Sequence, residues 1–363
     1  MSGLRAVLRF AAAALVALIF TTASSQQAAA QCNFFLPCPA PAATIGSVQS
    51  SSQGSLFDIG SHFQTRLGAL ASSRTAASTG NNPQGGGADP TYDRYRTWFE
   101  GYGTTSRTDA QGEFLGDRRR TYGGIAGIGV SVTPGVTFGL SVDSGRSDID
   151  VPGASGRIDL TQVGVIGAFE RGPWALGATV IHGFGTVHSS RFDAGGISSA
   201  SYHARLWGAM SELSYFVPLP NNSRFVPKIT FDWLRSSTDN FTETGGIAPV
   251  AGSGVTANRI RMLIGGEIGH SWLVGRQIFD FAVYAKLVEN LQQNIGDLVI
   301  SDATVGSPPQ LVSGVRESSA GADAGAAFSV KISPLTRLYA AYDGRFRGNL
   351  TSHSGTFGAE FRW

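Results

Sequence analysis

The sequence predicts an all-β protein: a twelve-stranded antiparallel transmembrane β-barrel of the outer membrane, preceded by a short helix and linker segment. Three observations predict it: strands with alternating polarity, connections that alternate between short and long, and an aromatic C-terminal strand. In that last strand Phe357, Phe361 and Trp363 share one face, and small or charged residues occupy the other. One face for lipid and one for water is typical of a membrane barrel. Pairing of the last strand with the first would remove the exposed sheet edge.

Composition supports this fold class. Among 363 residues there are 48 glycines, only 15% are charged, and the mean hydropathy is close to zero. A helical membrane protein would contain apolar runs of about 20 residues, and none follows the N-terminus. Without Arg5 and Arg9 the 28 basic residues fall to the acidic count of 26. A near-neutral chain gives no support for nucleic-acid binding, which needs a basic surface.

Residues 1–30 have the pattern of a secretory signal peptide. Arg5 and Arg9 precede an apolar run from Ala11 to Phe20, and Ala28 and Ala30 supply the small residues of a cleavage site. The apolar run is too short for a comfortable membrane span, which favours cleavage over retention as an anchor. We therefore expect export through the Sec machinery and removal of the signal peptide.

Residues 31–54 form a short segment that holds Cys32 and Cys38, the only two cysteines. In an exported chain two nearby cysteines most simply form one disulfide. A lipoprotein is the alternative for Cys32, although Gln31 fits poorly before a lipidated cysteine. A metal site would need further ligands nearby, and the sequence offers none, so we expect no cofactor.

Residues 55–92 combine a candidate amphipathic helix with a linker rich in Gly and Pro. Apolar residues recur at helical spacing, at Leu56, Ile59, Phe63, Leu67 and Leu70. Ser55 is a suitable N-cap for such a helix. Two positions are open for it: on the barrel rim or membrane surface, or inside the pore.

Residues 93–363 form the predicted barrel. Alternation places strands near 95–106, 119–132, 135–148, 157–170, 173–188, 201–217, 224–237, 258–273, 276–290, 317–332, 335–346 and 350–363. Short turns alternate with longer polar loops, which are expected at Arg107–Arg118, Asp143–Gly156, His188–Ser201, Ser236–Asn258 and Asn290–Glu317. Periplasmic turns are short and surface loops longer in bacterial outer-membrane barrels, so both barrel ends are expected on the periplasmic side.

Strand parity assigns a set of charged side chains to the lumen, because a basic residue facing lipid near mid-bilayer costs about 2–4 kcal/mol. They are Arg259, Arg261, Glu267, Asp280, Lys286, Asp323, Arg345, Glu360 and Arg362. Two roles are open: mutual pairing that rigidifies the wall, or contact with a pore helix or permeating ions. The tryptophans Trp98, Trp174, Trp207, Trp233 and Trp272 suit interfacial girdles.

Three stretches resemble a known family. They are Trp98-Phe-Glu-Gly-Tyr-Gly103, the strand Arg119-Arg-Thr-Tyr-Gly-Gly-Ile-Ala-Gly-Ile-Gly129, and Arg261 with Glu267 on one face of the eighth strand. With the ending Phe361-Arg362-Trp363, the chain from about Tyr92 is similar to the translocator domain of type V autotransporters. The resemblance implies a barrel in the outer membrane of a Gram-negative bacterium, a helix in its pore and an N-terminal passenger at the cell surface. It also implies that Phe357, Phe361 and Trp363 are the signal for the barrel-assembly machinery.

The sequence departs from that family before the helix. Between Gln31 and Ser55 there are no β-helix repeats and no protease or esterase motif, so we expect only a very short presented segment. A resident pore or adhesive surface protein is the alternative, and we expect a monomer in outer-membrane lipid. A barrel enzyme is a weaker alternative: His188 and Ser189 lie close in sequence, but no hydrolase signature surrounds them.

Overall fold

The computed structural model describes residues 41–71, 94–193, 196–275, 277–302 and 308–363. The predicted signal peptide, Cys32, Cys38 and the predicted linker at 72–92 lie outside the described residues. Within the described part of the chain no helix has both the length and the apolar character needed to cross a membrane.

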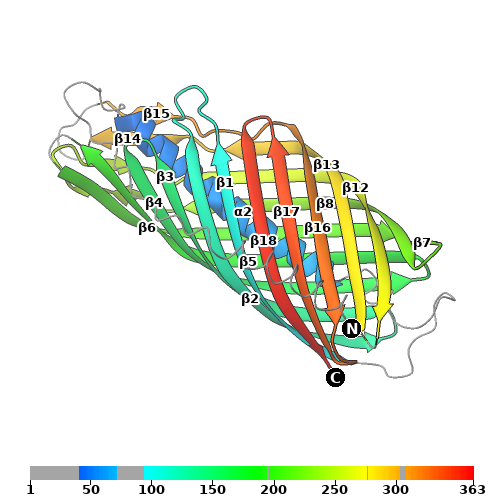
Figure 1. Cartoon of the computed structure of the whole chain (residues 1–363). Coiled ribbons are helices and arrows are strands. Elements are labelled where there is room, and N and C mark those ends of the chain that lie inside the picture. The colour runs from blue at the N-terminus through cyan, green and yellow to red at the C-terminus, as the bar shows by residue number, and fades with distance from the viewer. Residues whose placement is uncertain (1–40, 72–93, 194–195, 276, 303–307) are drawn as a thin grey trace, which may run out of the picture. The chain divides into compact units, whose positions relative to one another are not determined.

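Twelve long antiparallel strands close into a barrel (Figure 1). They are β1 (Tyr95–Thr108), β2 (Asp117–Thr133), β3 (Val136–Val151), β4 (Ala154–Arg171), β5 (Trp174–Asp193), β6 (Gly196–Tyr215), β8 (Ser223–Thr238), β12 (Thr256–Val274), β13 (Gln277–Ile295), β16 (Ala320–Lys331), β17 (Thr336–Arg347) and β18 (Leu350–Arg362). Each pairs with its neighbour in the chain, and β1 pairs with β18 from Arg96–Arg362 to Thr108–Leu350. The predicted fold class is confirmed.

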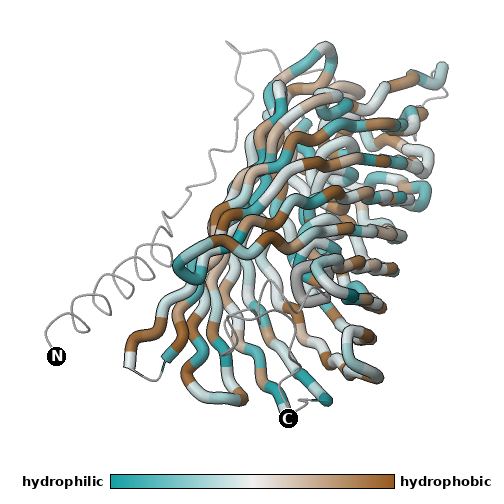
Figure 2. Tube along the Cα trace, turned by 90° about the vertical axis from the view of Figure 1, so that its right-hand side faces the viewer, coloured by the Kyte–Doolittle hydropathy of each residue, from teal (hydrophilic) through white to brown (hydrophobic). Residues whose placement is uncertain are grey.

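Exposed and buried side chains alternate between the lipid face and the lumen along strands such as β1, β3, β4 and β6. On β3, Phe138, Leu140 and Val142 are exposed on the outside, whereas Thr137, Ser141 and Asp143, at the alternate positions, are buried. Figure 2 shows the same alternation of apolar and polar positions along neighbouring strands. Apolar residues can cover the outside because the surrounding solvent is lipid.

The two rims of the barrel differ. Short turns at Gly135, Gly172 and Gly275, each with positive φ, lie at the rim where β1 begins and β18 ends. The other rim carries the longer connections, including a small sheet of β9 (Phe241–Thr242), β11 (Val250–Gly252), β14 (Leu298–Asp302) and β15 (Gln310–Val312). Two further short strands, β7 (Val217–Leu219) and β10 (Thr244–Gly245), and the 31-residue helix α2 (Pro41–Ala71) complete the assignment.

Two predicted loops are wrong. Most of Asp143–Gly156 and of His188–Ser201 is strand, because β3 and β4, and β5 and β6, extend as hairpins beyond the predicted ends. Their small and charged residues suggest a loop, but they pair across the hairpin: Arg146 Nε lies 2.6 Å from Asp159 Oδ1. Polar residues are tolerated on both faces there because the extensions pass beyond the hydrocarbon.

Two further predictions need correction. Helix α2 begins at Pro41 and not at Ser55, because its first part has polar partners in the barrel and needs no apolar stripe. Trp98 is fully buried in the lumen, whereas Trp174 and Trp207 are about half exposed on the outside. Both faces of β1 carry aromatic residues, so parity alone does not assign Trp98.

Candidate functional site

Helix α2 runs through the lumen from one rim of the barrel to the other (Figure 1). Near its start the Ser47 hydroxyl accepts a hydrogen bond from the Leu115 N–H (3.0 Å), in the connection between β1 and β2. Near its end Arg66 contacts Glu100, in the half of β1 nearer the rim where that strand begins. The chain therefore crosses the barrel from the rim with the long connections to the opposite rim before entering β1.

One side of the helix is apolar. Leu56, Ile59, Phe63 and Leu67 are each at most 1% exposed. They belong to one buried cluster with residues of β3 to β6 that include Ile149, Ile158, Leu160, Ile181 and Leu206. A Cβ at Gly164 would lie 2.7 Å from Leu67 Cδ1, so glycine allows the helix to approach β4. The side chain of Leu70, the fifth residue of the predicted stripe, lies outside the described residues.

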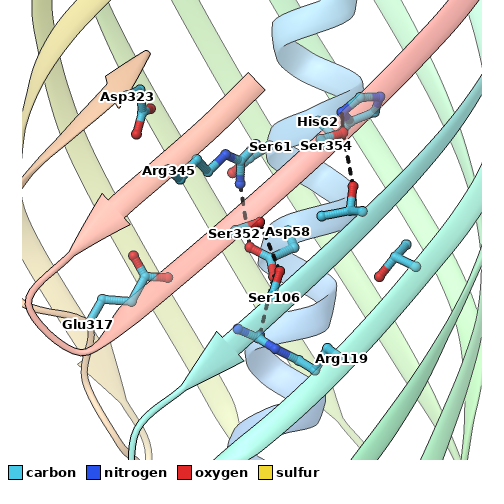
Figure 3. A network of polar contacts seen from close by, with 12 residues as sticks. Asp58, Ser61, His62, Ser106, Arg119, Glu317, Asp323, Arg345, Ser352 and Ser354 are labelled. Atoms are coloured by element: carbon cyan, nitrogen blue, oxygen red, sulfur yellow. Dashed lines mark hydrogen bonds and ion pairs between the residues drawn. The ribbon is translucent and has the colours of Figure 1, made fainter. Parts of the chain in front are cut away.

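The opposite side of the helix is charged, and Asp58 lies at its centre (Figure 3). Its carboxylate oxygens lie 3.4 Å from Arg119 Nη1 on β2 and 3.4 Å from Arg345 Nη1 on β17. The Ser106 hydroxyl of β1 donates a further hydrogen bond of 3.2 Å. Only 5% of Asp58 is exposed, and a buried carboxylate is costly unless it is paired. Three strands thus converge on one helix residue.

The hydroxyl of Ser61, one turn further along α2, accepts hydrogen bonds from two arginines of β12. Arg259 Nη2 donates to its hydroxyl at 2.6 Å and Arg261 Nη2 at 3.1 Å. Arg261 also pairs with Asp232 of β8, and Arg259 Nη1 lies 2.8 Å from Glu317 Oε1. Burial by itself raises the pKa of Glu317, but Arg259 and Arg261 lower it to about 2. Glu317 therefore stays ionised and holds Arg259 in place at neutral pH.

Two glutamines fix the first half of the helix without charge. Gln49 donates through Nε2 to the Thr238 hydroxyl at 2.6 Å and accepts from the Tyr202 hydroxyl at 2.7 Å. The Ser236 hydroxyl donates to Gln53 Oε1. Amide side chains have both donors and acceptors, so each glutamine can satisfy buried barrel groups of either kind.

The last turns of the helix are held by an ion pair that was not predicted from the sequence. Arg66 forms two hydrogen bonds to Glu100, of 2.8 and 3.0 Å, and the Tyr339 hydroxyl donates to the same carboxylate at 2.7 Å. The available signal was the second stripe of α2, in which Asp58, His62 and Arg66 recur every four residues on the polar face.

The nine predicted lumen charges divide into two groups. Arg259, Arg261 and Arg345 contact the helix, as described above. The other six pair with residues of the barrel wall: Glu267 with Lys228 (2.9 Å), Asp280 with Arg224 (2.6 Å), Lys286 with Glu212 (3.0 Å), Asp323 with Arg347 (2.8 Å), and Glu360 with Arg337 (2.9 Å) and Arg362 (2.5 Å). Some of the predicted lumen charges therefore contact the pore helix, and the others pair with one another or with further residues of the wall.

The first half of the helix is enclosed by the barrel, since every residue from Thr44 to Gln53 is buried. Two cavities there, one lined by Ile45 and Tyr202 and the other by Ser50 and Val312, have volumes of about 10 Å³ each. That volume holds roughly one water molecule. The helix thus plugs the barrel toward the rim with the long connections.

A closed twelve-stranded barrel with a lipid-facing apolar surface and a helix in its lumen defines a class of outer-membrane protein. The family model of the autotransporter beta-domain matches residues 97–343, and the chain belongs to that family. Its barrel accordingly lies in the outer membrane of Gram-negative bacteria.

Solved structures agree with this assignment of the fold. The translocator domain of the autotransporter NalP from Neisseria meningitidis superposes with a TM-score of 0.66 at 16% identity, covering 87% of this chain and 99% of that one. The beta domain of the Bordetella autotransporter BrkA gives a TM-score of 0.56 at 18% identity, covering 74% and 99%. No curated protein matches the chain.

Proposed function

We propose that this translocator barrel carries the segment that precedes α2 across the outer membrane, and that α2 then closes the pore. One observation supports the proposal above all others. Helix α2 enters at the rim with the long connections, which lie outside the cell in bacterial barrels, and ends toward the rim where β1 begins. We therefore expect whatever precedes Pro41 to reach the cell surface.

An epitope tag placed after Gln31 tests the proposal. On intact cells we expect antibody to bind the tag and added protease to remove it. A tag at Gly112, between β1 and β2, is the positive control, and a tag at Gly172, in the turn between β4 and β5, is the periplasmic control. A Gln31 tag that behaves like the Gly172 tag, protected until the membrane is permeabilised, would contradict translocation and favour a resident barrel.

We further propose that the signal peptide at 1–30 is cleaved after Sec export and that the last strand is the assembly signal. Phe357, Phe361 and Trp363 lie on the outside and are 50, 40 and 55% exposed. Three aromatic side chains on the lipid face suit recognition in the membrane. Phe361→Ser with Trp363→Ser should remove most folded barrel from the outer membrane, whereas Thr351→Ser on the same strand should not. Normal levels of the double variant would contradict this role.

We propose that the barrel is not an enzyme. His188 and Ser189 are neighbours on β5 and face opposite sides of the wall, His188 outward and Ser189 inward beside a small cavity. They cannot act together as base and nucleophile, which must lie within hydrogen-bond reach. Purified barrel should not hydrolyse lipid or peptide substrates. Hydrolysis that disappears in Ser189→Ala would contradict the proposal.

A further inference from the structure

A group of arginines lies on the outside of the barrel, toward the rim with the long connections. We call it the arginine patch: Arg107 of β1, Arg118 and Arg120 of β2, Arg146 of β3 and Arg157 of β4. All five occupy outward positions of adjoining strands. In the strand registers Arg118 lies between Arg107 and Asp150, and Asp148 lies between Arg120 and Arg157. The patch is therefore continuous across four strands.

The position of the patch along the strands corresponds to lipid headgroups. On β2 the outward residues Val132, Ile128 and Tyr122 are half exposed and apolar or aromatic, and Arg120 is the next outward residue. A tilted strand needs about 9–11 residues to cross the hydrocarbon. The segment from Val132 to Tyr122 has that length. Arg120 and Arg118 therefore lie just beyond the edge of the hydrocarbon. The same distance on β3 leads from Val136 to Arg146.

The chemistry of the patch favours phosphate. Every basic residue in it is arginine, whose planar guanidinium matches phosphate oxygens in a bidentate manner. Ion pairs with carboxylates include Arg146 with Asp159 (2.6 Å), Arg157 with Asp148 (3.2 Å) and Arg107 with Asp109 (3.4 Å). Such exposed pairs contribute little stability, so their side chains can exchange partners at small cost.

Among the described residues of the rest of the barrel, the outward arginines toward this rim are Arg205 of β6 and Arg235 of β8, and Arg205 lies 3.7 Å from Asp239. Toward the same rim, the outward residues of β16, β17 and β18 include Ala322, Phe346 and His353. Contact with headgroups alone therefore does not require arginine at this depth. Five of the outward arginines toward this rim therefore gather on β1 to β4, against two on β6 and β8.

We propose that the arginine patch binds the phosphate groups of lipid headgroups in the outer leaflet of the outer membrane. Phosphorylated glycolipid of this leaflet, lipopolysaccharide, presents phosphate at the depth where Arg118, Arg120 and Arg146 lie. Bound lipid would fix the orientation of β1 to β4 in the membrane. The inference is independent of translocation, because it concerns only the outer surface.

The test uses the full chain in detergent, titrated with lipopolysaccharide that carries its lipid A phosphates, with the same lipid after dephosphorylation, and with inorganic phosphate alone. Lipid bound per barrel is counted by native mass spectrometry. Phosphorylated lipid should bind wild type about 30-fold more tightly than it binds Arg118→Gln with Arg120→Gln. This ratio corresponds to about 2 kcal/mol, since each basic side chain near an anionic surface contributes about 1 kcal/mol.

A matched control removes two exposed arginines outside the patch, Arg171→Gln at a periplasmic turn and Arg316→Gln in the connection before β16. It should bind phosphorylated lipid like wild type, and all variants should retain the heat-resistant mobility of a folded barrel. Equal binding of dephosphorylated lipid, or an equal loss in the control, would overturn the proposal. Inorganic phosphate that displaces the lipid at the same concentration would assign the patch to a free anion and also overturn it.

Discussion

The two sides of helix α2 are held in different ways. Toward β3 to β6, Phe63, Leu67 and their neighbours are buried against apolar wall residues. On the side toward β1, β2, β12 and β17, Asp58 forms ion pairs with arginines, and Ser61 accepts hydrogen bonds from arginines. Apolar burial is non-directional and tolerates small shifts, whereas a buried ion pair loses its partner on displacement. The apolar side therefore supplies affinity, and the charged side sets the rotation and register of the helix.

The largest effect is expected on the apolar side. Phe63→Ala removes a fully buried ring and should reduce the free energy of helix release by about 3–5 kcal/mol, the usual cost of such a truncation. The urea concentration at which protease cuts α2 within the folded barrel measures helix release. An unchanged midpoint would show that the apolar contact does not hold the helix.

Asp58→Ala should have the next largest effect, about 2–3 kcal/mol, because it leaves the Arg119 and Arg345 guanidinium groups without their helix partner. Combining it with Arg345→Ala should cost less than the sum of the two single changes. Strictly additive losses would mean that the two groups do not interact.

Ser61→Ala should cost about 1–2 kcal/mol, since one hydroxyl accepts from both Arg259 and Arg261. Ser51→Ala is the matched control: Ser51 is equally buried in α2, and its hydroxyl has no hydrogen-bond partner. The comparison fails if the two serine variants release the helix at the same urea concentration.

Lys286→Met should change helix release least, by less than about 0.5 kcal/mol. Lys286 pairs with Glu212 in the wall and not with the helix. The variant should instead lower the temperature at which the barrel itself unfolds, seen as loss of heat-resistant mobility. If the variant weakened helix binding as much as Asp58→Ala does, ion pairs within the wall could not be distinguished from ion pairs between the wall and the helix.

The strands could be predicted from the sequence because the face that contacts lipid must be apolar. Apolar residues such as Phe138 and Leu140 therefore recur at every second position. The extended hairpins could not be predicted, since beyond the hydrocarbon neither face must be apolar. The apolar stripe from Leu56 to Leu67 indicates a helix because one side of α2 must be apolar where it packs against the inner wall of the barrel.

The contacts of that helix depend on partners far away in the chain. In the sequence Gln49 and Gln53 look like linker residues. Only the fold brings their hydrogen-bond partners, Thr238 and Ser236, beside them. Parity places Arg261 and Lys286 alike in the lumen, and only depth in the barrel decides that the first reaches α2 and the second does not. A period-two pattern predicts whether a side chain faces the lumen or the lipid, but not how deep in the barrel it lies.

A cross-link tests the central claim, that α2 occupies the lumen in this register, most directly. The Ser55 hydroxyl of α2 accepts a hydrogen bond of 3.1 Å from the Ser147 hydroxyl of β3. In full chain with Cys32→Ser and Cys38→Ser, we expect Ser55→Cys with Ser147→Cys to form a disulfide in outer membranes under a mild oxidant. Its fast-migrating band should revert on reduction, and Ser51→Cys with Ser147→Cys should not give it. Failure of the first pair to cross-link, or equal yield from both pairs, would contradict the account.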